Sequence, residues 1–164
     1  MANTFSRPTR SIAAAALTVA ALLTGCGDEP RPSPYGAPPT AALNEEFREG
    51  GLAFTVTNVD LGQPKIGNRT PEGTFVVVTM RVRNVGNWPR TVYCQNQRLT
   101  DLTGRSYENA VPVGPVEDMI DIKPGARVAI QCAFDVPVGT LAGVVEVHDQ
   151  AYSDGVTVRV LSVG

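Results

Sequence analysis

The sequence has little of the chemistry that most enzyme sites use. His148 is its single histidine, so any imidazole-based catalytic site would have to include that residue. A zinc site needs several histidine, cysteine or carboxylate ligands at recognisable spacing, and the sequence does not supply such a set. Strand alternation places His148 beside Glu146 on a solvent-facing side, which favours an exposed surface histidine. We therefore predict a chain that is not an enzyme and that holds no metal or cofactor.

A block of charge of one sign is also missing. The 164-residue chain carries 14 basic and 16 acidic residues, and neither kind is concentrated in one segment. Proteins that bind nucleic acids usually carry a basic stripe that neutralises phosphates. We therefore predict no nucleic-acid partner.

No apolar run is long enough for a membrane-spanning helix, which needs roughly 20 apolar residues. The longest run, residues 12–23, follows Arg7 and Arg10, as in a secretory signal peptide. It ends in Leu23-Thr24-Gly25-Cys26, which resembles the bacterial lipobox. The resemblance implies cleavage before Cys26 and a diacylglyceryl thioether on its sulfur, with acyl chains such as palmitate. The alternative is an ordinary secretory signal that ends near a cysteine.

Two acyl chains on Cys26 would make a stable membrane anchor. The prediction is an exported lipoprotein on the outer face of the cell membrane, within the cell envelope. Residues 1–25 would be the signal peptide, 26–50 the lipidated cysteine and a proline-rich tether, and 51–164 the folded domain. Dense proline favours an extended spacer. A proline-rich recognition motif and a short helical turn over residues 41–49 remain alternatives within the tether.

From residue 52 onward, apolar residues recur at every second position, which is the period of a β-strand. Each predicted strand would therefore have one face in a core and one in water. The inward set comprises Leu52, Phe54, Val56, Val76, Val78, Met80, Val82, Val128, Ile130, Cys132, Phe134, Val136, Val145, Val147, Val156, Val158 and Val160. Turns rich in glycine, proline, asparagine and aspartate separate the strands. The pattern predicts an all-β sandwich.

Three cysteines are present, and Cys26 is assigned to lipid. Cys94 and Cys132 both fall in the inward phase of their predicted strands and would lie in an oxidising compartment. We predict a structural disulfide between them. A redox-active pair is the alternative, although the Cys-x-x-Cys spacing of such pairs is missing.

Several segments resemble one bacterial domain family. Gly73–Gly86 is similar to its apolar strand followed by Asn-x-Gly, and Leu99–Tyr107 to its hairpin with Asp-x-x-Gly-x-x-Tyr. Ile122–Gly125 and Ala133–Pro137 are similar to its apolar-x-Pro-Gly and Phe-Asp-Val-Pro signatures. The family is the telokin-like, immunoglobulin-like domain of unknown function found in bacterial, especially actinobacterial, lipoproteins and secreted antigens. The resemblance implies an immunoglobulin-like antiparallel β-sandwich of about seven strands and brings no catalytic residues.

Candidate contact residues lie in two predicted loops. Trp88 and Tyr93 follow the Asn-x-Gly turn, and Glu117 and Asp118 belong to an acidic loop. Exposed aromatics are frequent hot spots, although loop aromatics also fold back onto the end of a sandwich. Our leading hypothesis is a non-enzymatic module that binds an envelope protein or cell-wall partner through a sheet edge or these loops.

A second hypothesis is an extracytoplasmic carrier of a small molecule or lipid. It is motivated by the segment from Phe75 to Val78, which is apolar on both sides of the strand. A fully buried central strand would explain the same pattern.

Overall fold

The computed structural model describes residues 38–114 and 119–160. The predicted signal peptide, Cys26, Glu117 and Asp118 lie outside these ranges. In chain order the elements are β1 (Thr40–Ala42), β2 (Phe47–Glu49), β3 (Leu52–Gln63), β4 (Thr74–Asn84), β5 (Arg90–Tyr93), the 3₁₀ turn η1 (Cys94–Asn96), β6 (Arg98–Asp101), β7 (Ser106–Tyr107), β8 (Val111–Pro112), β9 (Met119–Ile122), β10 (Arg127–Val136), β11 (Ala142–Val147) and β12 (Val156–Arg159). The described part of the chain contains no helix with the length and apolar character needed to cross a bilayer.

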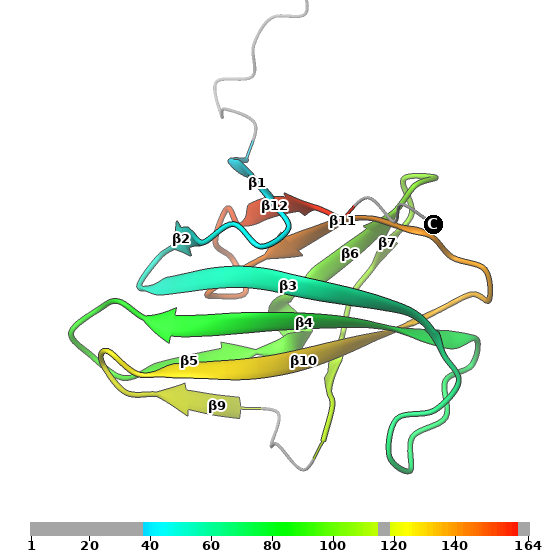
Figure 1. Ribbon diagram of the computed structural model, residues 1–164, viewed down its shortest axis with the longest axis horizontal. Helices are drawn as coiled ribbons and strands as arrows, with labels where there is room; N and C mark the ends of the chain where they lie inside the picture. Colours follow the sequence, from blue (N-terminus) through cyan, green and yellow to red (C-terminus); the bar gives the residue numbers. More distant parts are fainter. Residues whose placement is uncertain (1–37, 115–118, 161–164) are drawn as a thin grey trace, which may run out of the picture. The chain divides into compact units, whose positions relative to one another are not determined.

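The strands form two five-stranded sheets and one two-stranded ribbon (Figure 1). One sheet has the order β1-β12-β11-β6-β7, the other has the order β2-β3-β4-β10-β8, and the ribbon pairs β5 with β9. The predicted all-β sandwich is therefore confirmed. The structure divides the chain into more strands than the seven or so predicted, because strands of two to four residues such as β1, β2, β7 and β8 extend the sheet edges.

The predicted inward set forms the core. Its members are buried in the structure, apart from Val128, which is half-buried. Phe54, Val78 and Phe134 come from three adjacent antiparallel strands and are fully enclosed. Burying such side chains contributes roughly 1.5–3 kcal/mol each, so the alternating strands supply most of the driving force for folding.

The second apolar side of β4 is also covered. Phe75 and Val77 pack with Ala133 in a small cluster on the opposite face of the sheet from the main core. Partly buried residues of two neighbouring segments, Ile66, Val111 and Val113, lie against this cluster. Local packing therefore accounts for the apolar pattern that motivated the carrier hypothesis.

The sandwich begins earlier than the sequence analysis places it. β1 and β2 both lie within residues 26–50, where the sequence predicts a tether, and the 41–49 segment contains strands in place of the alternative helical turn. β1 pairs in parallel with β12, with Ala41 opposite Val158, and β2 pairs with the start of β3. Ala41 is buried, so this segment contributes to the core.

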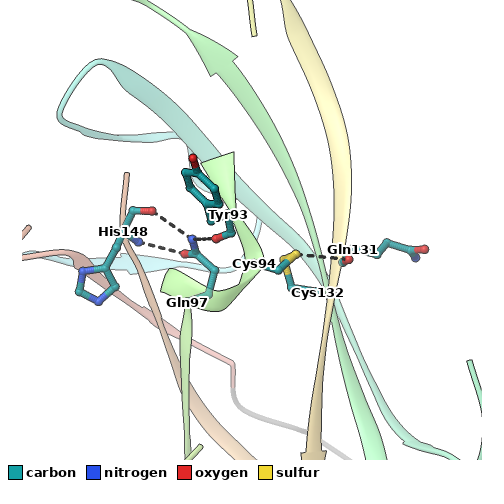
Figure 2. The surroundings of a disulfide bond; sticks show 6 residues. All are labelled: Tyr93, Cys94, Gln97, Gln131, Cys132 and His148. Carbon is teal, nitrogen blue, oxygen red and sulfur yellow. Dashed lines mark hydrogen bonds between the residues drawn. A yellow bond between two sulfur atoms is a disulfide. The ribbon is translucent and has the colours of Figure 1, made fainter. Parts of the chain in front are cut away.

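The structure joins Cys94 and Cys132 by a disulfide (Figure 2). Cys94 is the first residue of η1, and Cys132 lies in the middle of β10, so the bond ties the β5–β6 connection to the second sheet. The Cα atoms are 5.3 Å apart, within the usual range. The Cys94 sulfur lies 3.6 Å from the carbonyl oxygen of Gln131, a contact without a hydrogen bond because a disulfide sulfur carries no proton.

Candidate functional site

Trp88 is presented on a turn that a buried asparagine holds in place. Asn84, at the end of β4, is 1% exposed, and its Nδ2 donates to the carbonyl oxygens of Trp88 (2.7 Å) and Ile122 (2.8 Å). Its Oδ1 accepts from the backbone N–H of Gly86 at 2.9 Å. The Trp88 side chain is 79% exposed. A large aromatic side chain therefore stands in solvent on a backbone that is fixed in advance of any contact.

The other turns at this end of the sandwich are tied to the same asparagine or to Val85, the residue after it. The backbone N–H of Asn84 donates to Ala126, and the N–H of Gly125 donates to the carbonyl of Asn84, so the β9–β10 turn packs against the Trp88 turn. The N–H of Val85 donates to Gly51, which adds the β2–β3 turn. The Asn-x-Gly and apolar-x-Pro-Gly segments of the family resemblance thus meet here and build one rigid end.

The structure separates the aromatic candidates that the sequence analysis grouped. β5 and β9 are antiparallel, with Arg90 opposite Ile122 and Tyr93 opposite Met119. Trp88 precedes Arg90 and therefore lies at one end of this ribbon, whereas half-buried Tyr93 lies at the other. The partner-binding role of Trp88, Tyr93, Glu117 and Asp118 stays a prediction. Met119, which follows the undescribed acidic pair Glu117 and Asp118, is at the Tyr93 end.

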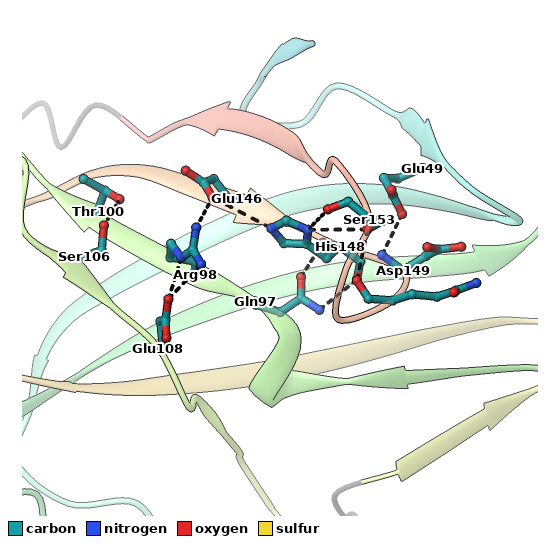
Figure 3. Close-up of polar contacts among 11 residues, drawn as sticks. Glu49, Gln97, Arg98, Thr100, Ser106, Glu108, Glu146, His148, Asp149 and Ser153 are labelled. Carbon is teal, nitrogen blue, oxygen red and sulfur yellow. Dashed lines mark hydrogen bonds and ion pairs between the residues drawn. The ribbon is translucent and has the colours of Figure 1, made fainter. Parts of the chain in front are cut away.

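Two carboxylates are buried together beside the Trp88 end. Glu49 of β2 is 9% exposed and Asp149 of the β11–β12 loop is 6% exposed. Glu49 Oε2 accepts the backbone N–H of Asp149 at 2.7 Å (Figure 3), and Asp149 Oδ2 accepts the N–H of Gly51 at 3.2 Å. The Arg90 guanidinium lies 3.5 Å from Asp149. The sequence does not reveal this pair, because the two residues are 100 positions apart.

Burial dominates the electrostatics of Asp149. The pKa of Asp149 is raised from 3.8 to about 6, chiefly by desolvation and also by a hydrogen bond and charge repulsion with Glu49. The N–H of Gly51 and the Arg90 charge oppose the rise. Gly50 makes the close approach feasible, because it has a φ of +57° and a Cβ there would lie 1.8 Å from Asp149 Oδ2.

His148 is covered, which corrects the prediction of an exposed surface histidine. Its side chain is 12% exposed, although it does lie beside Glu146 as predicted, with Nε2 3.8 Å from Oε2 (Figure 3). The β11–β12 loop folds back over the imidazole. Gly155 allows this, because a Cβ at that position would lie 2.5 Å from the His148 ring. Strand alternation cannot reveal a loop that returns over its own strand.

His148 lies between Ser153 and Glu146, the three residue types of a hydrolytic triad. Their hydrogen bonding, however, does not suit catalysis. His148 Nδ1 lies 3.1 Å from the carbonyl oxygen of Ser153, which can only accept, so Nδ1 carries the proton. It then has no lone pair for the Ser153 hydroxyl 3.4 Å away, and that hydroxyl donates to Gln150 instead. The serine therefore has no general base and is not an activated nucleophile.

Buried Gln97 links this loop to η1 (Figures 2 and 3). Its Nε2 donates to the carbonyls of Tyr93 (2.8 Å) and His148 (3.0 Å), and its Oε1 accepts the N–H of His148 at 3.0 Å. Arg98 lies between Glu108 and Glu146, 2.7 Å and 3.1 Å away. These polar groups form hydrogen bonds and ion pairs with one another, as in a network that stabilises the fold.

The opposite end of the sandwich carries an exposed apolar group that sequence analysis missed. Leu102, Val138 and Leu141 are 58%, 81% and 51% exposed and line an open hollow of about 340 Å³. Asp101 fixes the adjoining hairpin, and hydrogen bonds led by that of the Thr103 hydroxyl lower its pKa from 3.8 to about 2. In the sequence, this exposed apolar group could have been found from Leu102, an apolar residue within a turn.

The comparisons with known proteins agree with this architecture. The family model described as "Domain of unknown function (DUF4352)" matches residues 41–158. MPT63, a secreted protein from Mycobacterium tuberculosis, is similar over 78% of this chain and 100% of its own, with a TM-score of 0.62 and 19% identity. An uncharacterized beta-sandwich protein from Clostridium difficile is similar over 74% of this chain and 93% of its own (TM-score 0.50, 10% identity). None of the curated proteins matches the chain.

Proposed function

This chain belongs to the DUF4352 family of domains of unknown function, and we propose that it is a lipid-anchored envelope protein whose sandwich is a non-enzymatic binding module. The anchor is Cys26, and the partner is a protein or cell-wall component that contacts the Trp88 turn. The lipobox-like Leu23–Cys26 segment supports the anchor. MPT63, which shares the fold, is described as a secreted protein.

The observation that carries the binding role is the exposure of Trp88 on a fixed turn. Tryptophan is enriched among interface hot spots, and a turn held by Asn84 loses little conformational entropy when a partner binds. The non-enzymatic part rests on the hydrogen bonding of His148, which leaves Ser153 without a base. The carrier alternative has less support, because Phe75 and Val77 are already covered by protein.

Photo-crosslinking on cells tests the contact directly. A photoreactive amino acid at exposed Asn87 would be paired with either Trp88 or Trp88→Ala, and adducts would be identified by mass spectrometry. We expect a discrete protein or glycan adduct that falls at least about tenfold in Trp88→Ala, because a hot-spot truncation weakens binding by about 2 kcal/mol or more.

The matched control is Leu102→Ala, which truncates an exposed apolar residue at the opposite end and should leave the adduct unchanged. Equal adducts with and without the Trp88 side chain would refute a contact at this turn. Loss of the adduct in both variants would also refute it.

A further inference from the structure

Four arginines gather on the outer face of the second sheet, at the Trp88 end. Strand register places Arg48 and Arg83 on either side of Ala53, and Arg83 directly opposite Arg127. Arg81 lies two residues before Arg83 on β4 and therefore on the same side of the sheet. We call these four residues the arginine face. The row from Arg48 to Arg127 crosses three strand spacings, about 14 Å.

The fold itself does not account for this concentration of charge. Like charges directly opposite each other on antiparallel strands are destabilising, as at Arg83 and Arg127. In the ranges that the structure describes, the face is balanced by one ion pair, between Arg83 and Glu46 at 2.6 Å. Arg48, Arg81 and Arg127 are exposed. By contrast, Arg98 on the other sheet is flanked by two carboxylates.

Arg81, Arg83 and Arg127 of the arginine face line one small hollow. Ala53, Thr55 and Glu46 also line it, and its volume is about 120 Å³. That volume equals only a few water molecules, so it suits a phosphate group and excludes a bulky ligand. Guanidinium forks bind phosphate oxygens in pairs, which gives such a group several donors at once.

Farther along the same face the charge is mixed. Asp60 lies opposite Val77, and Asp135 lies opposite Phe75, which puts both carboxylates on the outer side near the far end of the strands. Lys65 and Arg69 lie in the β3–β4 loop, whose Ile66 packs on this side of the sheet, so they offset these two carboxylates. A flat anionic surface would therefore attract the Trp88 end of the sheet more strongly than the far end. The face has a defined docking direction.

We propose that the arginine face docks on the anionic phosphate headgroups of the membrane that holds the lipid anchor. The basic charge comes from β2, β4 and β10 and is spread over two dimensions, which suits a surface of many headgroups. Each arginine near an anionic bilayer raises affinity about fivefold, too little for capture from solution at physiological salt. A tether removes that difficulty, because it makes the second contact intramolecular. The fourteen backbone steps from Cys26 to Thr40 reach at most about 50 Å, enough to bring the face to the bilayer.

The biological setting rests on the anchoring in the proposed function, but the test does not use the anchor. The mature chain carrying Cys26→Ser would be sedimented with vesicles of phosphatidylcholine alone or with about one third phosphatidylglycerol. At about 0.05 M salt we expect binding to the anionic vesicles only, and its loss at about 0.5 M salt. The combination Arg48→Gln, Arg81→Gln and Arg127→Gln should weaken binding about a hundredfold.

The matched control changes the same charge elsewhere, with Lys65→Gln, Arg69→Gln and Arg159→Gln, three exposed positions off the arginine face. It should keep most of the binding. An equal loss of vesicle binding in both triple variants would show that only the net charge matters, and this would overturn the proposal. So would binding to a soluble poly(glycerol phosphate) or to inorganic phosphate without binding to vesicles. Vesicle binding with no Trp88-dependent adduct would uphold the arginine face and refute the partner site.

Discussion

At the scale of single residues, Asp149 is the most unusual group in the described structure. It is buried beside a second carboxylate, Glu49, and Arg90 gives it only partial compensation at 3.5 Å. Its pKa is raised to about 6, so the folded protein binds a proton that the unfolded chain releases near pH 4. The stabilisation from that proton is complete below about pH 4 and is lost as pH rises through about 6.

Asp149→Asn should therefore stabilise the protein at neutral pH. Asparagine is close in size, accepts from Gly51 and can donate to Glu49, so it imitates the protonated acid at every pH. We expect the free energy of unfolding to rise by about 1–2 kcal/mol at pH 7.5, a figure reduced from the full shift for screening by solvent and Arg90.

The measurement is urea unfolding at pH 4, 6 and 7.5. The advantage of the variant should vanish at pH 4. Asp154→Asn, which changes an exposed carboxylate of the same loop, serves as the control and should show no such trend. An equal effect of Asp149→Asn at pH 4 and 7.5 would contradict a titrating, buried Asp149.

Some residue-level features could be predicted from the sequence and others could not. The burial of Phe54 and Phe134 follows from alternation, which is a local property. The burial of His148 depends on a loop that returns over the ring through Gly155. The pairing of Glu49 with Asp149 depends on contact between segments 100 residues apart. Such features depend on tertiary contacts, which cannot be predicted from the residues adjacent in the sequence.

At the scale of elements, long strands were predictable and short ones were not. β4 and β10 alternate over ten or more residues and pair along their length. β1 and β2 have three residues each, too few to show a period, and a parallel partner such as β12 lies at the far end of the chain. For that reason the sequence predicts a tether over these residues.

The disulfide is the covalent link between the layers, and its removal should lower stability. Closing a loop of 38 residues limits the unfolded chain, which gives about 4 kcal/mol in the chain-entropy account and typically 2–4 kcal/mol in practice. Reductant should therefore shift the urea midpoint of the wild-type chain downward. The double variant Cys94→Ser with Cys132→Ser should unfold at a lower urea concentration than the wild type, and reductant should not change its midpoint. A wild-type midpoint that reductant leaves unchanged would argue against the bond.

At the scale of the whole molecule, charge is distributed in a way that the sequence conceals. The chain has a formal net charge of −2 and no basic run, which led us to predict no nucleic-acid partner. The arginine face is assembled by strand register from β2, β4 and β10 and is invisible in the linear order. Fold class was predictable because it depends on periodicity, whereas the surfaces of the module depend on which strands become neighbours.

The most direct test of the account is intact mass spectrometry of the protein taken from its native membrane, with and without reduction. We expect a chain that begins at Cys26, carries acyl chains on that residue and gains the mass of two hydrogen atoms on reduction. An unlipidated chain that begins elsewhere, or one with two free thiols before reduction, would contradict it.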